Sequence, residues 1–273
     1  MMSLLIAGVG AAVAGGAQAA VYLSALGSTI RAQRRSRIVM RPGTLRELPQ
    51  FDHSALDALT HELQGLGFDW LGDVISTHDL DTSQPDDSEG APRASKSLMP
   101  EVRTQTTGLL RVTAHPEHSC YGTLISCISE TSPSPGSEHL MPQNRVTVAP
   151  FRTAVTSLSG SGDAMWAYGT SNRERQAISR LHRHPRVLGA RLPGANAGHL
   201  LAHHLQRRGE VARAGGFAWD PQTSAERYMA YEDRVVRHLR AVYAGMSTLK
   251  AARGLLGFHF DNSAEWLGEL AGR

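Results

Sequence analysis

The longest apolar stretch of the chain lies at its start. From Leu4 to Leu26 no residue is charged, and most are Ala, Gly, Val, Leu or Ile. About 23 helical residues at ~1.5 Å each span roughly 34 Å, enough for a hydrocarbon core of about 30 Å. The pattern predicts a transmembrane helix over residues 1–28.

Basic residues follow this segment directly. Six arginines precede the first acidic residue, Glu47. Because positive charge is retained on the cytoplasmic side of a membrane, we expect residues 29–50 to form a basic juxtamembrane linker of a single-pass protein in the cell membrane, with the main domain cytoplasmic. Lipid bilayers with anionic headgroups would attract four of these arginines: Arg31, Arg34, Arg35 and Arg37.

Small residues recur at every fourth position of the apolar segment, at Gly8, Ala12, Gly16 and Ala20. Such a stripe lets two membrane helices approach closely, so it indicates self-association through helix–helix packing. The general abundance of Ala and Gly in the segment explains the same pattern without a dimer.

The N-terminal segment has two other interpretations. Ala17-Gln18-Ala19 has the form of a signal-peptide cleavage site, but the arginines follow the apolar run rather than precede it. Residues Gly8 and Gly10 resemble the start of the G-x-G-x-x-G turn of Rossmann-type oxidoreductases, although Val13 replaces the third glycine. No acidic residue lies about 20 positions further on, where that fold binds a ribose.

Residues 51–273 are expected to form one cytoplasmic α+β domain. A helix is predicted after Ser54, because leucines recur at spacings of three and four up to Leu66. Phe68 to Ile75 reads as a strand. The polar segment at about 77–104 has no apolar period and is predicted to be a disordered loop.

Three extended runs follow this loop. Alternation from Gly108 and the apolar run Cys120 to Ile128 predict a hairpin. Arg145 to Leu158 is a further extended run in which Pro150 indicates a bend or an edge position. After a Gly-rich turn at 159–163, alternation resumes, and neighbouring strands are expected to pair in antiparallel fashion.

A long amphipathic helix is predicted after Thr223 and Glu226, which form a capping box. It should cover one face of the sheet. The expected fold class is therefore α+β: an N-terminal transmembrane helix followed by an antiparallel sheet of about five strands covered by amphipathic helices.

Charge distribution argues against nucleic-acid binding. The net charge is +3, and removing the six N-terminal arginines leaves about −3 for the rest. The folded part therefore lacks an excess of positive charge for phosphate backbones.

The histidines of the segment 199–204 are candidates for a metal site. His199 and His203 have the i, i+4 spacing with which one helix face binds a metal, and Glu210 could be a third ligand. The glutamate of the H-E-x-x-H arrangement is absent. Exposed helix histidines are the alternative interpretation. His204 lies nearer the apolar face, which indicates a packed, hydrogen-bonded core residue.

A thiol nucleophile is conceivable at Cys120, close to His115 and His118, but a cysteine in an apolar strand is usually a small core residue. No cofactor is expected. The leading hypothesis is a membrane-anchored protein whose cytoplasmic domain binds an unidentified partner or ligand without catalysis. The alternatives are a membrane-associated metal-dependent hydrolase and a Rossmann-type oxidoreductase.

Overall fold

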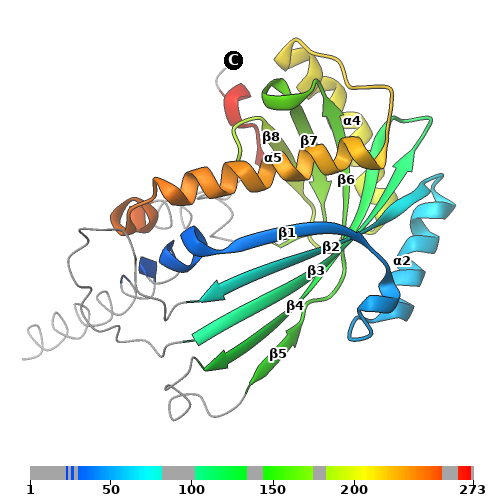
Figure 1. Ribbon diagram of the computed structural model, residues 1–273. Helices are drawn as coiled ribbons and strands as arrows, with labels where there is room; N and C mark the ends of the chain where they lie inside the picture. Colours follow the sequence, from blue (N-terminus) through cyan, green and yellow to red (C-terminus); the bar gives the residue numbers. More distant parts are fainter. Residues whose placement is uncertain are drawn as a thin grey trace, which may run out of the picture.

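A mixed sheet of nine strands is the centre of the molecule (Figure 1). The computed structural model describes residues 23, 26–27, 30–81, 102–133, 144–174, 183–253 and 264–271. The strands are β1 (Arg37–Gly43), β2 (Asp69–Asp81), β3 (Val102–His115), β4 (Cys120–Pro133), β5 (Arg145–Val148), β6 (Arg152–Ser159), β7 (Trp166–Ser171), β8 (Val187–Arg191) and β9 (Glu265–Trp266). The labelled helices are α2 (His53–Gly65), α4 (Ala197–Gly215) and α5 (Ala225–Ala244), and single turns of 3-10 helix are η1 (Leu45–Glu47), η2 (Gly162–Ala164) and η3 (Gly268–Leu270).

The strand order is β1-β2-β3-β4-β6-β7-β8-β9, with β5 also paired to β4. All neighbours are antiparallel except β7 and β8, which are parallel. The predicted β3–β4 hairpin is confirmed over its full length. The predicted bend at Pro150 is confirmed too, because β5 and β6 pair with successive parts of β4 on either side of this residue.

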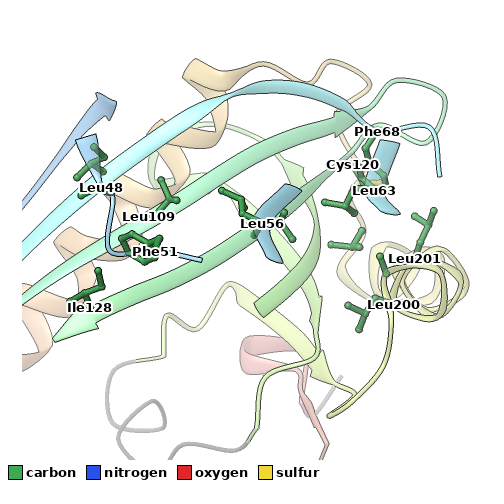
Figure 2. Packing of buried hydrophobic residues seen from close by; sticks show 14 residues of the cluster. Leu48, Phe51, Leu56, Leu63, Phe68, Leu109, Cys120, Ile128, Leu200 and Leu201 are labelled. Carbon is green, nitrogen blue, oxygen red and sulfur yellow. The ribbon is translucent and has the colours of Figure 1, made fainter. Parts of the chain in front are cut away.

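Helices α2 and α4 cover one face of the sheet. Leu56 and Leu63 of α2 and Leu200 of α4 are fully buried in one cluster with Leu124 of β4 (Figure 2). Burial of each such leucine contributes about 1.5–3 kcal/mol. The predicted start of α2 is close to the observed one, where the Asp52 side chain accepts a hydrogen bond from the helix backbone.

Helix α5 covers the opposite face. Its Tyr228 packs on Val112 and Tyr121, and the two tyrosine ring centroids are 5.0 Å apart. The helix begins one residue later than predicted, because the hydroxyl of Ser224, rather than that of Thr223, accepts the backbone N–H of Arg227. An Ncap serine of this kind satisfies one of the free donors of the first turn.

The predicted fold class is wrong in its sheet, which has nine strands and a parallel pair instead of about five antiparallel strands. Strand β1 was interpreted as part of a linker, because Arg37, Arg41, Pro42 and Gly43 conceal its alternation. Strands β8 and β9 have five and two residues, too few for a clear period. Both ends of the loop predicted at about 77–104 lie in strands, since β2 continues to Asp81 and β3 begins at Val102, and residues 82–101 lie outside the described residues.

The expectation of a transmembrane helix is also corrected. Within the described ranges, no helix is both long and apolar enough to cross a membrane. Leu26, at the end of the apolar segment, is 7% exposed and packs against Tyr243 and Met246, so it contributes to a protein core. Most of residues 1–28 lie outside the described residues, and so do the small residues predicted to pack between helices: Gly8, Ala12, Gly16 and Ala20.

A buried ion pair fixes α2 to the sheet. Arg111 of β3 donates two hydrogen bonds to the Asp73 carboxylate of β2, at 2.8 and 2.9 Å, and a third to the hydroxyl of Thr60 on α2, at 3.0 Å. The side chains of Arg111 and Asp73 are only 11% and 4% exposed. Hydrogen bonding to the Asp73 carboxylate raises the pKa of Arg111, so the arginine stays charged at this buried position.

We expect Arg111→Ala to lower the free energy of unfolding by about 3–5 kcal/mol, because it leaves the Asp73 carboxylate buried without its partner. Arg103→Ala is the matched control. It breaks the exposed pair with Asp79 on the same two strands and should cost below about 1 kcal/mol. Urea unfolding of both variants measures the difference, and equal losses would contradict a structural role for the buried pair.

Candidate functional site

The residues predicted to bind a metal lie on α4 and do not form a ligand set. His199 is in the first turn, where its backbone N–H donates to Asn196. The carboxylate of Glu210 pairs with Arg207. Within the described part of the chain, no three His, Cys, Asp or Glu side chains come together as a metal-binding group, so the proposed set with His203 gains no support from the geometry.

The arginines predicted to contact lipid belong to the folded domain. Arg31, Arg34 and Arg35 lie in a helical segment at residues 30–35, and Arg37 begins β1. Arg34 donates to the carbonyl oxygens of Tyr243 at 2.9 Å and Met246 at 2.7 Å, so this cation caps the C-terminus of α5. Contact of these arginines with anionic lipid stays a prediction.

His204 is a core residue, as predicted. It is fully buried, with Nε2 2.9 Å from the Ser157 hydroxyl and Nδ1 3.3 Å from the Thr170 hydroxyl. Burial and the nearby cation of Arg208 lower the pKa of His204 to about 3. The ring is therefore neutral at physiological pH and is a poor proton acceptor.

The Ser157–His204 pair resembles a nucleophile and its base only in composition. In a catalytic triad a carboxylate orients the histidine, whereas here Nδ1 faces the hydroxyl of Thr170. Ser157 and His204 are both 0% exposed, which leaves no path for a substrate. The pair connects α4 to β6 and β7 as a structural network.

The Cys120 thiol is similarly enclosed. Burial raises its pKa to about 12, even though Arg208 acts in the opposite direction. Because the thiolate is the reactive form of cysteine, this side chain has the character of an inert core residue. His115 and His118 lie against each other, with ring centroids 4.2 Å apart.

A second buried cation, Arg234, joins α5 to η2 and to the start of β7. Arg234 is 5% exposed and donates to the carbonyl oxygens of Met165 and Asp163, the latter at 2.9 Å. It also lies 3.1 Å from Nε2 of His184, and burial together with this cation lowers the pKa of His184 to about 4. These contacts fix the position of α5 relative to η2 and β7.

The candidate site is a groove of about 280 Å³ between β1 and α5, two segments that lie side by side (Figure 1). Its floor and walls combine apolar side chains with three charged ones. They are Ile38 and Met40 from β1, and Ala230, Asp233, Val236, Arg237 and Arg240 from α5.

Strand β1 brings main-chain groups to this groove. In the part of the chain that the structure describes, β1 is an edge strand whose one partner is β2. Arg240 donates to the carbonyl oxygen of Ile38 at 2.8 Å, which shows that the main-chain groups of Ile38 point away from β2. Since this direction alternates along an antiparallel strand, those of Met40 and Pro42 point the same way.

Pro42 agrees with this assignment, because proline is tolerated in an edge strand where its missing N–H would face outward. Among the described residues, no hydrogen bond from outside the sheet reaches the N–H or C=O of Met40. On this assignment, Met40 turns a main-chain donor and acceptor toward α5, and the described residues supply no partner for either group.

Sequence reasoning missed this site. Its only local signal is the apolar run Ile38-Val39-Met40 in a segment that Pro42 and Gly43 make look irregular. The other wall lies about 200 residues further along the chain, and only the folded structure brings the two together.

Comparison with known proteins identifies no relative. No protein-family model matches the chain, and neither the curated proteins nor the solved structures contain a match. The geometry of the molecule is thus the basis for a functional proposal.

The stability of the fold should depend on pH through His204. The pKa of His204 is about 3 in the folded chain, whereas the ordinary histidine pKa of 6.5 applies when the chain unfolds. The unfolded state then binds more protons between these pH values, so stability falls as pH is lowered through this window, by up to about 1.4 kcal/mol per pH unit.

His204→Gln removes the group that binds about one extra proton in the unfolded state. The slope of the free energy of unfolding against pH, measured between about pH 4 and pH 6, should therefore fall by up to about 1.4 kcal/mol per pH unit. His199→Gln, which removes an exposed histidine from the same helix, is the control. If His204→Gln kept the wild-type slope, the buried neutral histidine would be refuted.

Proposed function

We propose that the domain binds an extended segment of a partner polypeptide, which adds as a strand to the free edge of β1 in the groove between β1 and α5, without chemistry. The observation that carries this proposal is the set of outward main-chain groups at Ile38 and Met40 beside the α5 wall. In strand addition, main-chain hydrogen bonds supply affinity and adjacent side-chain pockets supply specificity.

The edge of β1 has the features of a site that is protected but accessible. Free strand edges invite aggregation, and proteins limit this with charged side chains and proline. Here Arg240 covers one carbonyl oxygen and Pro42 removes one donor. A partner strand can displace the single Arg240 contact, whereas no described residue outside the sheet bonds to the N–H or C=O of Met40.

The free edge at β5 offers less than the edge at β1. Strand β5 has four exposed residues and pairs only with β4. The hollow beside it, about 170 Å³, is lined by side chains from the ends of β3 and β4, together with Asn144 and Val146, and no helix faces it. Strand addition at β5 would therefore gain main-chain hydrogen bonds but no helix wall to select the partner.

Two facts support binding without chemistry. Ser157 contacts His204 in the fold, and Cys120 lies near His118 in the sequence. Both of these potential nucleophiles are fully buried. The groove contains no histidine, cysteine, serine or threonine among its lining residues. The hydrolase and oxidoreductase alternatives find no corresponding arrangement in the described part of the chain, and attachment to a bilayer and self-association stay predictions.

Met40→Pro tests the proposal at the main chain. It removes the outward N–H of Met40 while the β1–β2 ladder, which uses the alternate residues, keeps its hydrogen bonds. Peptides selected from a phage-displayed library of random 12-residue sequences serve as probes, and their affinity for the full chain is measured by fluorescence anisotropy.

We expect Met40→Pro to weaken binding at least about tenfold, the equivalent of one lost hydrogen bond, and Met40→Leu to change it less than about threefold. Both variants should retain the wild-type circular dichroism spectrum. Failure to select any peptide, or equal binding by the two variants, would overturn strand addition at β1.

A further inference from the structure

The α5 wall of the groove presents its charges in a fixed order. Asp233, Arg237 and Arg240 are spaced four and three residues apart, so they form one stripe along the helix. All three line the groove and are exposed. The wall therefore has one negative charge at its N-terminal end followed by two positive charges.

Neither arginine is neutralised within the groove. Arg240 donates to a carbonyl oxygen, and no ion pair of the described residues joins Arg237 or Arg240 to a carboxylate. By contrast, Arg41 on the same strand is already paired with Glu47. Two guanidinium groups are thus able to receive an incoming carboxylate by charge-assisted hydrogen bonds.

The direction of α5 relative to β1 follows from two contacts. Arg34, just before β1, donates to the carbonyl oxygen of Tyr243, and Arg240 donates to the carbonyl oxygen of Ile38. The later residue of β1 thus meets the earlier residue of α5, so the two segments run in opposite directions. Asp233 lies seven residues before Arg240, about 10.5 Å along the helix axis. Three strand residues at ~3.3 Å cover the same distance, which places Asp233 near the Pro42 end of β1.

His78 gives independent evidence of unsatisfied polarity at the Arg240 end. It is the cross-strand neighbour of Ile38, and its Nε2 atom is buried without a hydrogen-bond partner among the described residues. Burial lowers the pKa of His78, with Arg240 acting in the same direction and Asp79 in the opposite one. The two arginines that line the groove are donors that suit a carboxylate.

We propose that the segment bound at β1 is acidic, with its carboxylates at the Ile38 end, beside Arg237 and Arg240, and with an uncharged or basic residue facing Asp233. This inference rests on the proposed strand addition and names the partner class: an extended acidic peptide. Asp233 excludes a uniformly acidic segment by like-charge repulsion, and so gives the groove a polarity as well as a charge preference.

The test uses the same peptide library and the full-length chain. Selected peptides should be enriched in Asp and Glu at one end, and replacement of those residues by Asn and Gln should weaken binding at least about tenfold. Binding should also weaken as ionic strength rises. A copy with an amidated C-terminus identifies the source of the carboxylate: retained binding assigns it to side chains, and lost binding assigns it to the chain terminus.

Charge reversal of the wall is the matched experiment on the protein. The double variant Arg237→Glu with Arg240→Glu should weaken binding of the acidic peptide by about thirtyfold or more. The control, Arg145→Glu with Arg213→Glu, makes the same change in net charge at exposed arginines away from the groove and should have an effect below about threefold. Asp233→Lys should strengthen binding of a peptide that is acidic at both ends.

If the double variant does not fold, the single variant Arg237→Glu replaces it in the binding measurement. Arg237 makes no hydrogen bond with the described residues, so its replacement should leave the fold intact. Peptides selected without acidic enrichment, or equal losses in the double variant and its control, would overturn the charge inference. Strand addition at β1 would still stand in that case if Met40→Pro weakened peptide binding and Met40→Leu did not. Selection of no peptide at all would overturn the proposed function itself.

Discussion

A strand that buries both of its faces must be covered from both sides, and β4 imposes this requirement on the whole molecule. Its residues Cys120–Leu124 are buried without interruption. Leu124 points to the side of α2 and α4, whereas Tyr121 points to the side of α5. Because apolar area removed from water is the main favourable term of folding, both helical layers follow from this one strand.

The position of α5 then determines where a groove can form. Its Tyr228 is anchored over the centre of the sheet, and its two ends are fixed by polar contacts. At the start, the Tyr121 hydroxyl accepts the N–H of Ser224, and at the end Arg34 caps the last carbonyl oxygens. Arg234 adds a lateral contact to η2. These four attachments make α5 a preformed wall, and a preformed surface generally lowers the entropic cost of binding.

Several elements could be predicted from the sequence, because their signals are local. The spacing of leucines identified α2, the alternation and apolar run identified the β3–β4 hairpin, and Pro150 located the bend between β5 and β6. The orientation of His204 toward the core also followed from helical geometry. In each case the residues that determine the structure lie within one turn or one strand of one another.

The missed features depend on contacts between distant residues. Strand β1 has only a three-residue apolar run, flanked by Arg37 and Arg41 and followed by Pro42, so its pairing with β2 is needed to reveal it. The parallel β7–β8 pair requires a long connection that a hairpin pattern does not indicate. The arginines near the N-terminus were interpreted through their charge alone, whereas Arg34 serves as a donor to carbonyl oxygens of α5. Side-chain partners of this kind cannot be read from local spacing.

Under the proposed function, Arg240 would have a double role at the β1 edge, in protecting the edge and in recognising its partner. Arg240 covers the Ile38 carbonyl oxygen in the free domain, which reduces the tendency of the edge to pair with other chains. The same guanidinium has several donors in a planar fork, so it can turn from a carbonyl oxygen to a carboxylate without losing its hydrogen bonding. An acidic strand would thus replace the covering contact with a stronger one, whereas a neutral strand would displace it without compensation. Under this proposal, protection of the edge and selection of its partner would both be functions of the Arg240 side chain.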